Sequence, residues 1–209
     1  MEQTVDKDPA TFTDMMRLRF KGVIEPIAGF LNRIGIKPNT VTYLGLLGNA
    51  IGAILVAFGY VTWGGVVVLV TAPFDALDGT MARLRGEATQ WGAFVDSVSD
   101  RYSELLLLGG LMVYYLRQGT WWECALVYLA AAGSVMVSYV KARAESLGYE
   151  AKIGILTRLE RYIVLVPCLI FNIPIIAAGI LAVFANFTAF QRIYYVRQQT
   201  YRDEKKLEQ

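Results

Sequence analysis

Four aspartates lie close together in a chain that is otherwise rich in apolar residues: Asp75, Asp78, Asp96 and Asp100. The first two are three positions apart and the last two are four apart, so each pair would share one face of a helix. Carboxylates that face one another repel, and burying them without compensation is unfavourable. The spacing therefore predicts a site in which a positive charge holds the four acids together.

The residue types available favour a hard divalent cation as that charge. The chain has no histidine, so carboxylates would supply the ligands. Oxygen ligands without nitrogen or sulfur suit Mg²⁺, Mn²⁺ or Ca²⁺ rather than Zn²⁺. Four acids also suffice for two ions, the arrangement that stabilises the entering and leaving oxygens in phosphoryl transfer. The alternative is that the acids cap helix ends or pair with Arg83, Arg85 and Arg101 at an ordinary interface.

Two glycines and an arginine indicate that a phosphate-bearing ligand binds beside the acids. Gly79 follows Asp78 directly, and Gly92 lies four positions before Asp96. At either glycine a ligand or a neighbouring helix could come close where a side chain would block it. Arg83 carries a guanidinium fork that matches phosphate, and it lies five positions after Asp78.

The composition is that of a membrane protein. Of the 209 residues 55% are apolar and the mean hydropathy is +0.41, both high for a soluble globule. No charged residue occurs in 38–74, a run long enough for two helices that each cross a hydrocarbon core of about 30 Å. Further uncharged runs occur at 105–116, 124–140 and 162–191. We expect most of the chain after residue 38 to lie in the bilayer, in contact with membrane lipids.

Other features limit the possible functions. The N-terminal residues do not combine an apolar stretch with a small-residue cleavage site, so we expect no removable signal peptide. Cys124 and Cys168 lie far apart in apolar runs, which fits packing rather than a disulfide or a metal site. The net charge of +2 is too small to indicate a nucleic-acid partner.

The hydropathy pattern predicts an all-α integral membrane protein with six transmembrane helices preceded by an amphipathic juxtamembrane helix. In 12–34, apolar residues recur at three- and four-residue spacing with charged residues between them, as in a helix that lies along a membrane surface. Four transmembrane helices are predicted at 40–59, 64–84, 91–116 and 121–145. The next uncharged run has only 30 residues, at 162–191, whereas two full crossings need about 40. Either one long helix or two helices could occupy it.

The distribution of basic residues favours six crossings. The segments 7–37, 83–85, 141–161 and 192–206 hold nearly all the Lys and Arg, whereas the intervening turns hold only Arg117. With six helices every basic segment lies on one side, which the positive-inside rule identifies as the cytoplasm. We therefore expect a multi-pass cell-membrane protein whose termini and aspartates face the cytoplasm. Its single domain would span 1–209, with the transmembrane region at about 40–197 and a tail at 198–209.

Five basic residues are predicted on the same side as the aspartates: Lys141, Arg143, Arg158, Arg161 and Arg192. Arginine forks bind phosphate bidentately, so this cluster suits a phosphorylated acceptor and would repel a cationic one. Alternatively, the five charges set the topology and bind anionic lipid headgroups. Arg161 and Arg192 would lie slightly below the membrane surface, a depth at which charges usually line a cavity.

The aspartates and their neighbours together resemble the signature of the CDP-alcohol phosphotransferase family. The matching pattern is Asp75-x2-Asp78-Gly79-x2-Ala82-Arg83-x8-Gly92-x3-Asp96-x3-Asp100. The resemblance implies a membrane enzyme that moves a phosphatidyl group from CDP-diacylglycerol to an alcohol and releases CMP. It also implies a homodimer.

The same resemblance implies a role for each residue of the pattern. Asp75, Asp78 and Asp96 would be metal ligands, and Asp100 would be a metal-associated general base. Mg²⁺ or Mn²⁺, as two ions, would be the cofactor. The residues implied to meet the CDP moiety are Asp78, Gly79, Ala82, Arg83, Gly92 and Asn39, the last within a segment, 37–42, that resembles the family's segment before its first transmembrane helix.

The second half of the chain resembles the prokaryotic phosphatidylinositol-phosphate synthases of this family. The similar residues are 138–145, Arg158-x2-Arg161 and 191–193. The implied acceptor is inositol 1-phosphate, a phosphorylated polyol whose phosphate Lys141, Arg161 and Arg192 would hold. Glycerol 3-phosphate is the alternative acceptor. A cation or proton transporter is the alternative from another class, although the acids gather at one membrane face rather than at the midplane.

Overall fold

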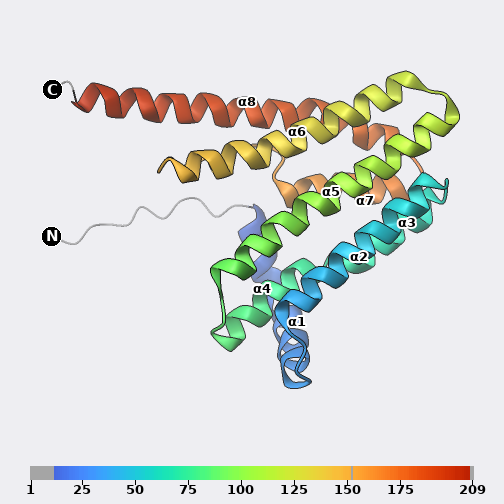
Figure 1. Cartoon of the computed structure of the whole chain (residues 1–209), viewed down its shortest axis with the longest axis horizontal. Helices are drawn as coiled ribbons and strands as arrows, with labels where there is room; N and C mark the ends of the chain where they lie inside the picture. The colour runs from blue at the N-terminus through green and yellow to red at the C-terminus, as the bar shows by residue number, and fades with distance from the viewer. Residues whose placement is uncertain (1–11, 152, 208–209) are drawn as a thin grey trace.

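The protein is built of helices packed side by side (Figure 1). The structure, a computed structural model, describes residues 12–151 and 153–207, and in these ranges it contains α-helices and no strand. The helices are α1 (Phe12–Arg33), α2 (Pro38–Ala57), α3 (Val61–Thr71), α4 (Phe74–Arg85), α5 (Gln90–Gln118), α6 (Trp121–Ser146), α7 (Arg158–Ile170) and α8 (Pro174–Leu207).

Four stretches of helix are long and apolar enough to cross a membrane. Within the described residues they are Pro38–Ala57, Val61–Arg85, Trp121–Ser146 and Pro174–Lys205. The prediction of a helical membrane protein is confirmed. Two further helices were predicted to cross: α5, which carries several charged residues, and α7, whose 13 residues extend only about 20 Å. Six crossings therefore stay a prediction.

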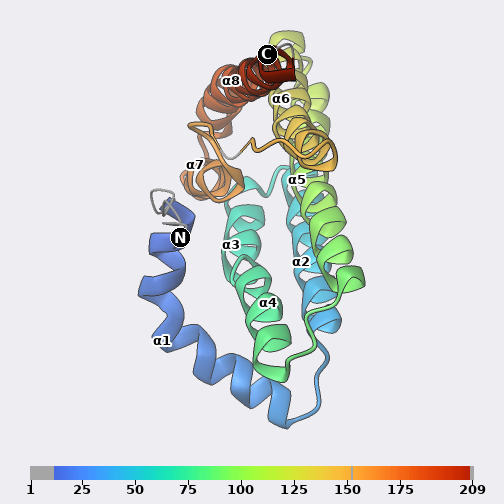
Figure 2. The same cartoon turned by 90° about the vertical axis from the view of Figure 1, so that its left-hand side faces the viewer.

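The helices after α1 run back and forth between two ends of the molecule. In Figure 1 the connections at 58–60, 119–120 and 171–173 lie together at one end, and the connections before α2, α5 and α7 lie away from it. Neighbouring helices pack along their lengths: α2 on α3 and α5, and α6 on α5 and α8. Figure 2 shows α1 running obliquely to the bundle, and it packs on α4.

The core lies between these helices and is apolar. Its fully buried side chains include Val56, Val68, Leu107, Leu111, Leu165, Leu169 and Leu181. Helices α2 and α5 approach so closely that a Cβ placed on Gly110 would lie 2.4 Å from the Ala53 carbonyl oxygen. This contact fixes α5, which carries two of the four aspartates, against α2.

Most predicted helix boundaries are close to the observed ones, and two differ. The helix predicted at 64–84 starts at Val61 and is interrupted before α4, because Pro73 has no backbone N–H and its ring clashes with a preceding carbonyl. The last helix, predicted to end near 197, continues to Leu207. Residues 198–207 are rich in Gln, Arg, Glu and Lys, which propagate a helix well, and contain neither Gly nor Pro.

Candidate active site

The break at Pro73 decides where the first aspartate pair lies. Because α4 begins at Phe74, Asp75 lies in its first turn, where the helix dipole stabilises a carboxylate. The second pair belongs to α5, whose start is capped by Thr89: its hydroxyl oxygen accepts a hydrogen bond from the Gly92 N–H at 3.0 Å. Asp75 and Asp78 therefore lie in the first two turns of α4, and Asp96 and Asp100 lie further along α5.

Three of the four aspartates form one cluster. Asp75, Asp96 and Asp100 each offer a carboxylate oxygen, and these three oxygens lie within 4.8 Å of one another. Oxygens this close can bind one Mg²⁺ or Mn²⁺, since Mg²⁺ takes oxygen ligands at about 2.1 Å and needs only a small adjustment of the side chains. The donor set and its geometry fit a divalent metal.

Asp78 lies apart from this cluster and is held by the protein. Its side chain is buried, and its carboxylate accepts hydrogen bonds from the Thr42 hydroxyl of α2 and from the Gly79 N–H, the latter at 2.5 Å. The bond with Thr42 ties α4 to the start of α2. The role of Asp78 as a metal ligand stays a prediction.

Arg158, in the first turn of α7, brings a positive charge directly to the acids. Its Nη1 lies 2.7 Å from an Asp75 oxygen and 2.6 Å from an Asp100 oxygen. Among the residues that the structure describes, its buried Nε has no hydrogen-bond partner. The guanidinium also lies over the Tyr162 ring, 5.6 Å from the centroid. The side chain as a whole is 30% exposed, so a ligand beside the acid cluster could reach part of the guanidinium.

A cavity of about 510 Å³ opens beside the acids. It is lined by Asp75, Asp78, Gly79, Thr80, Arg83 and Asp96, together with Lys21, Ile24, Glu25, Ala76 and Leu84. The Arg83 guanidinium donates to the Thr80 hydroxyl at 2.9 Å. The wall contributed by α1 was not predicted, because nothing in the spacing of Lys21 and Glu25 connects them with a site 50 residues away.

The remaining residues implied to meet CDP lie nearby. A Cβ placed on Gly92 would be 3.7 Å from the Asn39 side-chain oxygen, so the missing side chain keeps the space in front of Asn39 open. A Cβ on Gly79 would be 3.5 Å from an Arg83 nitrogen. Ala82 is half-buried and does not line the cavity. Their contact with the nucleotide stays a prediction.

The other four basic residues do not join Arg158 at the acids. Lys141 and Arg143 are at the end of α6, where the Lys141 ammonium lies 3.8 Å from Glu145 and Arg143 is exposed. The buried Arg192 donates to the carbonyl oxygens of Val137 at 2.6 Å and Ile153 at 2.8 Å. Arg161 is buried as well and is bound to Glu104. Their binding of an acceptor phosphate stays a prediction.

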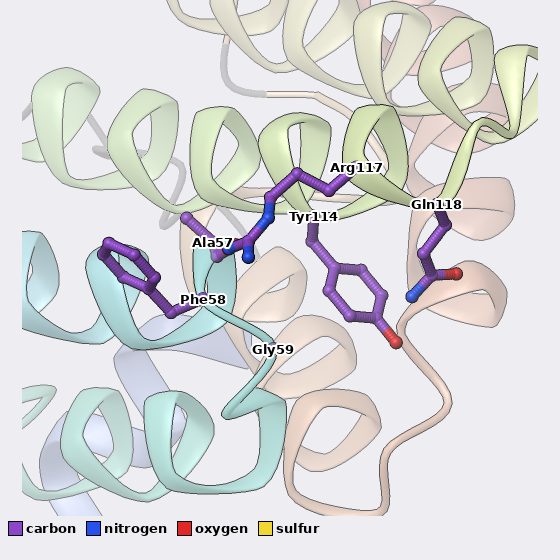
Figure 3. A pocket seen from close by; sticks show the side chains of 6 residues that line it. All are labelled: Ala57, Phe58, Gly59, Tyr114, Arg117 and Gln118. Atoms are coloured by element: carbon purple, nitrogen blue, oxygen red, sulfur yellow. The ribbon is translucent and has the colours of Figure 1, made fainter.

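A second cavity lies at the opposite end of the helices, near the α2–α3 connection (Figure 3). It is lined by Ala57, Phe58, Gly59, Tyr114, Arg117 and Gln118 and has a volume of about 230 Å³. The Arg117 guanidinium donates to the Ala57 carbonyl oxygen at 3.0 Å and lies over the Phe58 ring. None of the predicted site residues lines this cavity, so it is separate from the acid cluster.

Comparison with known proteins identifies the class to which this site belongs. The family model of the CDP-alcohol phosphatidyltransferases matches residues 36–191. The chain is 37% identical to the phosphatidylinositol phosphate synthase of Mycobacteroides abscessus over 194 residues, which cover 88% of this chain and 87% of that protein. The chain therefore belongs to the CDP-alcohol phosphatidyltransferase family and is an enzyme, as the aspartate pattern predicted.

Solved structures show the same fold. Crystal structures of the phosphatidylinositol phosphate synthase of Mycobacterium tuberculosis, one with CDP-DAG bound and one in complex with manganese and citrate, match with a TM-score of 0.77 and 31% sequence identity. Each match covers 83% of this chain, and the matches cover 93% and 88% of those chains. The manganese complex and the acid cluster together support a divalent metal site in this family.

Proposed function

We propose that the protein transfers the phosphatidyl group of CDP-diacylglycerol to a hydroxyl of inositol 1-phosphate, giving phosphatidylinositol phosphate and CMP. The observation that carries this proposal is the position of Arg158, whose partly exposed guanidinium lies against the acid cluster. A guanidinium at that place can hold the phosphate of an acceptor while the acceptor hydroxyl points toward the acids. The names of the relatives favour inositol phosphate over other phosphorylated acceptors.

The proposed roles of the acids come from the family resemblance, and the clustering of Asp75, Asp96 and Asp100 supports them. Asp75, Asp78 and Asp96 would hold Mg²⁺ or Mn²⁺, in our proposal two ions. Bound ions would neutralise charge on the diphosphate of the substrate and on the CMP that leaves. Asp100 would take the proton from the acceptor hydroxyl as that oxygen attacks the phosphorus next to diacylglycerol. The bond from this phosphorus to the bridging oxygen then breaks, and the oxygen leaves with CMP.

The nucleotide would occupy the cavity lined by α1, α4 and α5. Gly79 and Gly92 leave room for it, Asn39 faces Gly92, and Arg83 supplies a guanidinium at the cavity wall. With Ala82 and Asp78, these residues form the proposed CDP site.

Arg158 is the first residue that we propose as a contact of the acceptor phosphate. Lys141, Arg143 and Arg192 stay in the proposed pocket as residues that need a rearrangement to reach a ligand, because the side chains of Lys141 and Arg192 are engaged elsewhere and Arg143 is exposed. Glycerol 3-phosphate remains the alternative acceptor, since the same guanidinium would hold its phosphate. Because the chain belongs to this enzyme family, the alternative function as a cation or proton transporter is not supported.

We further propose six crossings of the cell membrane, with the acids and both termini on the cytoplasmic side. The common location of three connections at one end of the helices supports this topology. Among the described residues at that end, Arg117 is the only basic one, as expected for the side that does not face the cytoplasm. Helix α1 would lie in the interface, where its exposed side chains Phe20, Val23, Ile27, Phe30 and Ile34 meet lipid. A homodimer is proposed from family membership alone.

Cysteine labelling tests the topology. On a background without Cys124 and Cys168, a cysteine at position 118 should react with a membrane-impermeant thiol reagent in intact cells, and one at position 206 should be protected. Labelling at 206 and protection at 118 would contradict the proposed orientation. Labelling at both would indicate an odd number of crossings.

An acceptor screen tests the reaction. Purified protein would receive CDP-diacylglycerol with inositol 1-phosphate, glycerol 3-phosphate, inositol or serine, each with Mg²⁺ or with a chelator. We expect metal-dependent CMP release with inositol 1-phosphate above the other three. CMP release with serine or free inositol at an equal rate would show that no phosphate is recognised.

A further inference from the structure

A buried ion pair lies directly beneath the acid cluster. The Arg161 Nε lies 2.6 Å from one Glu104 carboxylate oxygen, and its Nη2 lies 2.8 Å from the other. The two residues are 1% and 4% exposed. The remaining nitrogen, Nη1, donates to the Leu156 carbonyl oxygen at 3.1 Å. Burying two charges is costly even when they are paired, so such a pair needs a reason other than stability.

The ion pair lies one helical turn away from the contact between Asp100 and Arg158 and joins the same two helices. Glu104 follows Asp100 by four positions on α5, and Arg161 follows Arg158 by three positions on α7. The same two helices are therefore joined twice, by Asp100 with Arg158 and by Glu104 with Arg161. A shift of α7 along α5 would break both connections, because each depends on the same register.

Further contacts tie the first turn of α7 to two other helices. The Tyr162 hydroxyl donates to the Asn49 side-chain oxygen of α2 at 3.2 Å. The Leu156 N–H, just before α7, donates to the Thr188 hydroxyl of α8 at 3.3 Å. The Arg161 contact with Leu156 links this second bond to the ion pair. The first turn of α7, which carries Arg158, is therefore held by contacts with α2, α5 and α8.

We propose that Glu104 and Arg161 are a positioning pair that fixes α7 against α5 and so keeps Arg158 at the acids. The proposal deepens the proposed function and rests on it, because it takes Arg158 as the acceptor contact. All three nitrogens of Arg161 are bonded to protein and its side chain is buried, so these contacts support a role in holding α7 in place.

The first test is Glu104→Gln, which leaves Arg161 in place without its charged partner. We expect kcat/KM for the acceptor to fall by about ten- to a hundredfold, because a displacement of about 1 Å at a reacting group costs that much. Glu123→Gln is the matched control, since this acid lies on α6 at the opposite end of the helices, and it should keep wild-type kinetics. Acceptor kinetics equal to those of the wild type in Glu104→Gln would contradict the proposal.

The second test separates positioning from stability. In Glu104→Leu/Arg161→Met both charges are absent, and replacing a buried pair by apolar residues is often neutral for folding. We expect a thermal midpoint at or above that of the wild type, with kcat/KM still reduced about tenfold or more. Recovery of wild-type kinetics in the stable double variant would overturn the proposal. Should that variant not fold, Glu104→Gln decides alone.

A third measurement needs no acceptor and so distinguishes failure of this inference from failure of the proposed function. Mn²⁺ binding to the purified protein, followed by electron paramagnetic resonance, should weaken about tenfold in Glu104→Gln, because Asp100 is one turn away on α5. Unchanged Mn²⁺ affinity would contradict the positioning role whatever the acceptor proves to be. If the wild type uses a different acceptor, the kinetic tests apply unchanged with that acceptor.

Discussion

The half of the molecule from α2 to α5 and the half from α6 to α8 contribute to the site in different ways. In the first half the acids lie on two helices, α4 and α5, and their spacing in sequence already shows which of them share a face. In the second half five basic residues are distributed over three helices, and Arg158 alone among them contacts the acids. A catalytic group on one helix face can be predicted from spacing, whereas a binding group that reaches across helices depends on how those helices pack.

The largest expected effect is in the first half, at the acid cluster. Asp96→Asn keeps the size of the side chain but removes a charge from the cluster. Metal-assisted stabilisation contributes several kcal/mol to the transition state, so phosphatidyl transfer should fall at least about a hundredfold. Turnover would be measured by CMP release, and folding by the elution profile in detergent. Wild-type turnover in Asp96→Asn would remove the acid cluster from the mechanism.

The next effect is at the one basic residue of the second half that contacts the acids. Arg158→Ala should raise the acceptor KM by about ten- to a hundredfold, since a charge-assisted hydrogen bond contributes about 1.5–3 kcal/mol. Arg158→Lys should recover part of this loss, because it keeps the charge and loses the fork. Arg202→Ala is the control, since Arg202 is exposed near the end of α8 and belongs to no proposed site. If Arg158→Ala and Arg202→Ala had the same acceptor KM, Arg158 would have no role in acceptor binding.

The same contrast explains how much could be predicted from the sequence. The helical membrane fold, most helix boundaries and the clustering of the acids followed from hydropathy and from spacing on helix faces. The interruption at Pro73 could have been predicted, because proline inside a helical pattern is a local signal. The binding of Arg161 by Glu104 could not, since the two are 57 positions apart and each equally suits a lipid-facing or ligand-facing role. A weak signal did exist: Glu104 lies one turn after Asp100 on the same face.

A smaller effect concerns the packing that holds α5 in place. Gly110→Ala puts a methyl group 2.4 Å from the Ala53 carbonyl oxygen, and overpacking of this kind costs about 1–3 kcal/mol. Its neighbour supplies the control, because a Cβ on Gly109 meets nothing within 4 Å. Thermal unfolding in detergent should show a lower midpoint for Gly110→Ala and an unchanged or higher one for Gly109→Ala. The reverse order would contradict the close packing of α2 on α5.

The smallest effect is expected at the cavity far from the acids. Arg117→Ala removes a hydrogen bond to Ala57 and the contact with the Phe58 ring, which at an exposed site contributes about 0.5–1 kcal/mol. Phosphatidyl transfer should stay within about twofold of the wild type, as for surface substitutions generally. A loss comparable with that of Arg158→Ala would show that the two ends of the molecule are coupled.

The central claim is that acids from the first half and Arg158 from the second form one centre that uses inositol 1-phosphate. The most direct measurement offers the purified protein CDP-diacylglycerol with equal concentrations of inositol 1-phosphate and glycerol 3-phosphate, and identifies the lipid product by mass spectrometry. We predict phosphatidylinositol phosphate as the main product in the wild type, and a much smaller yield of it in Arg158→Ala. Phosphatidylglycerol phosphate as the main product, or a product ratio and yield that Arg158→Ala leaves unchanged, would contradict the account.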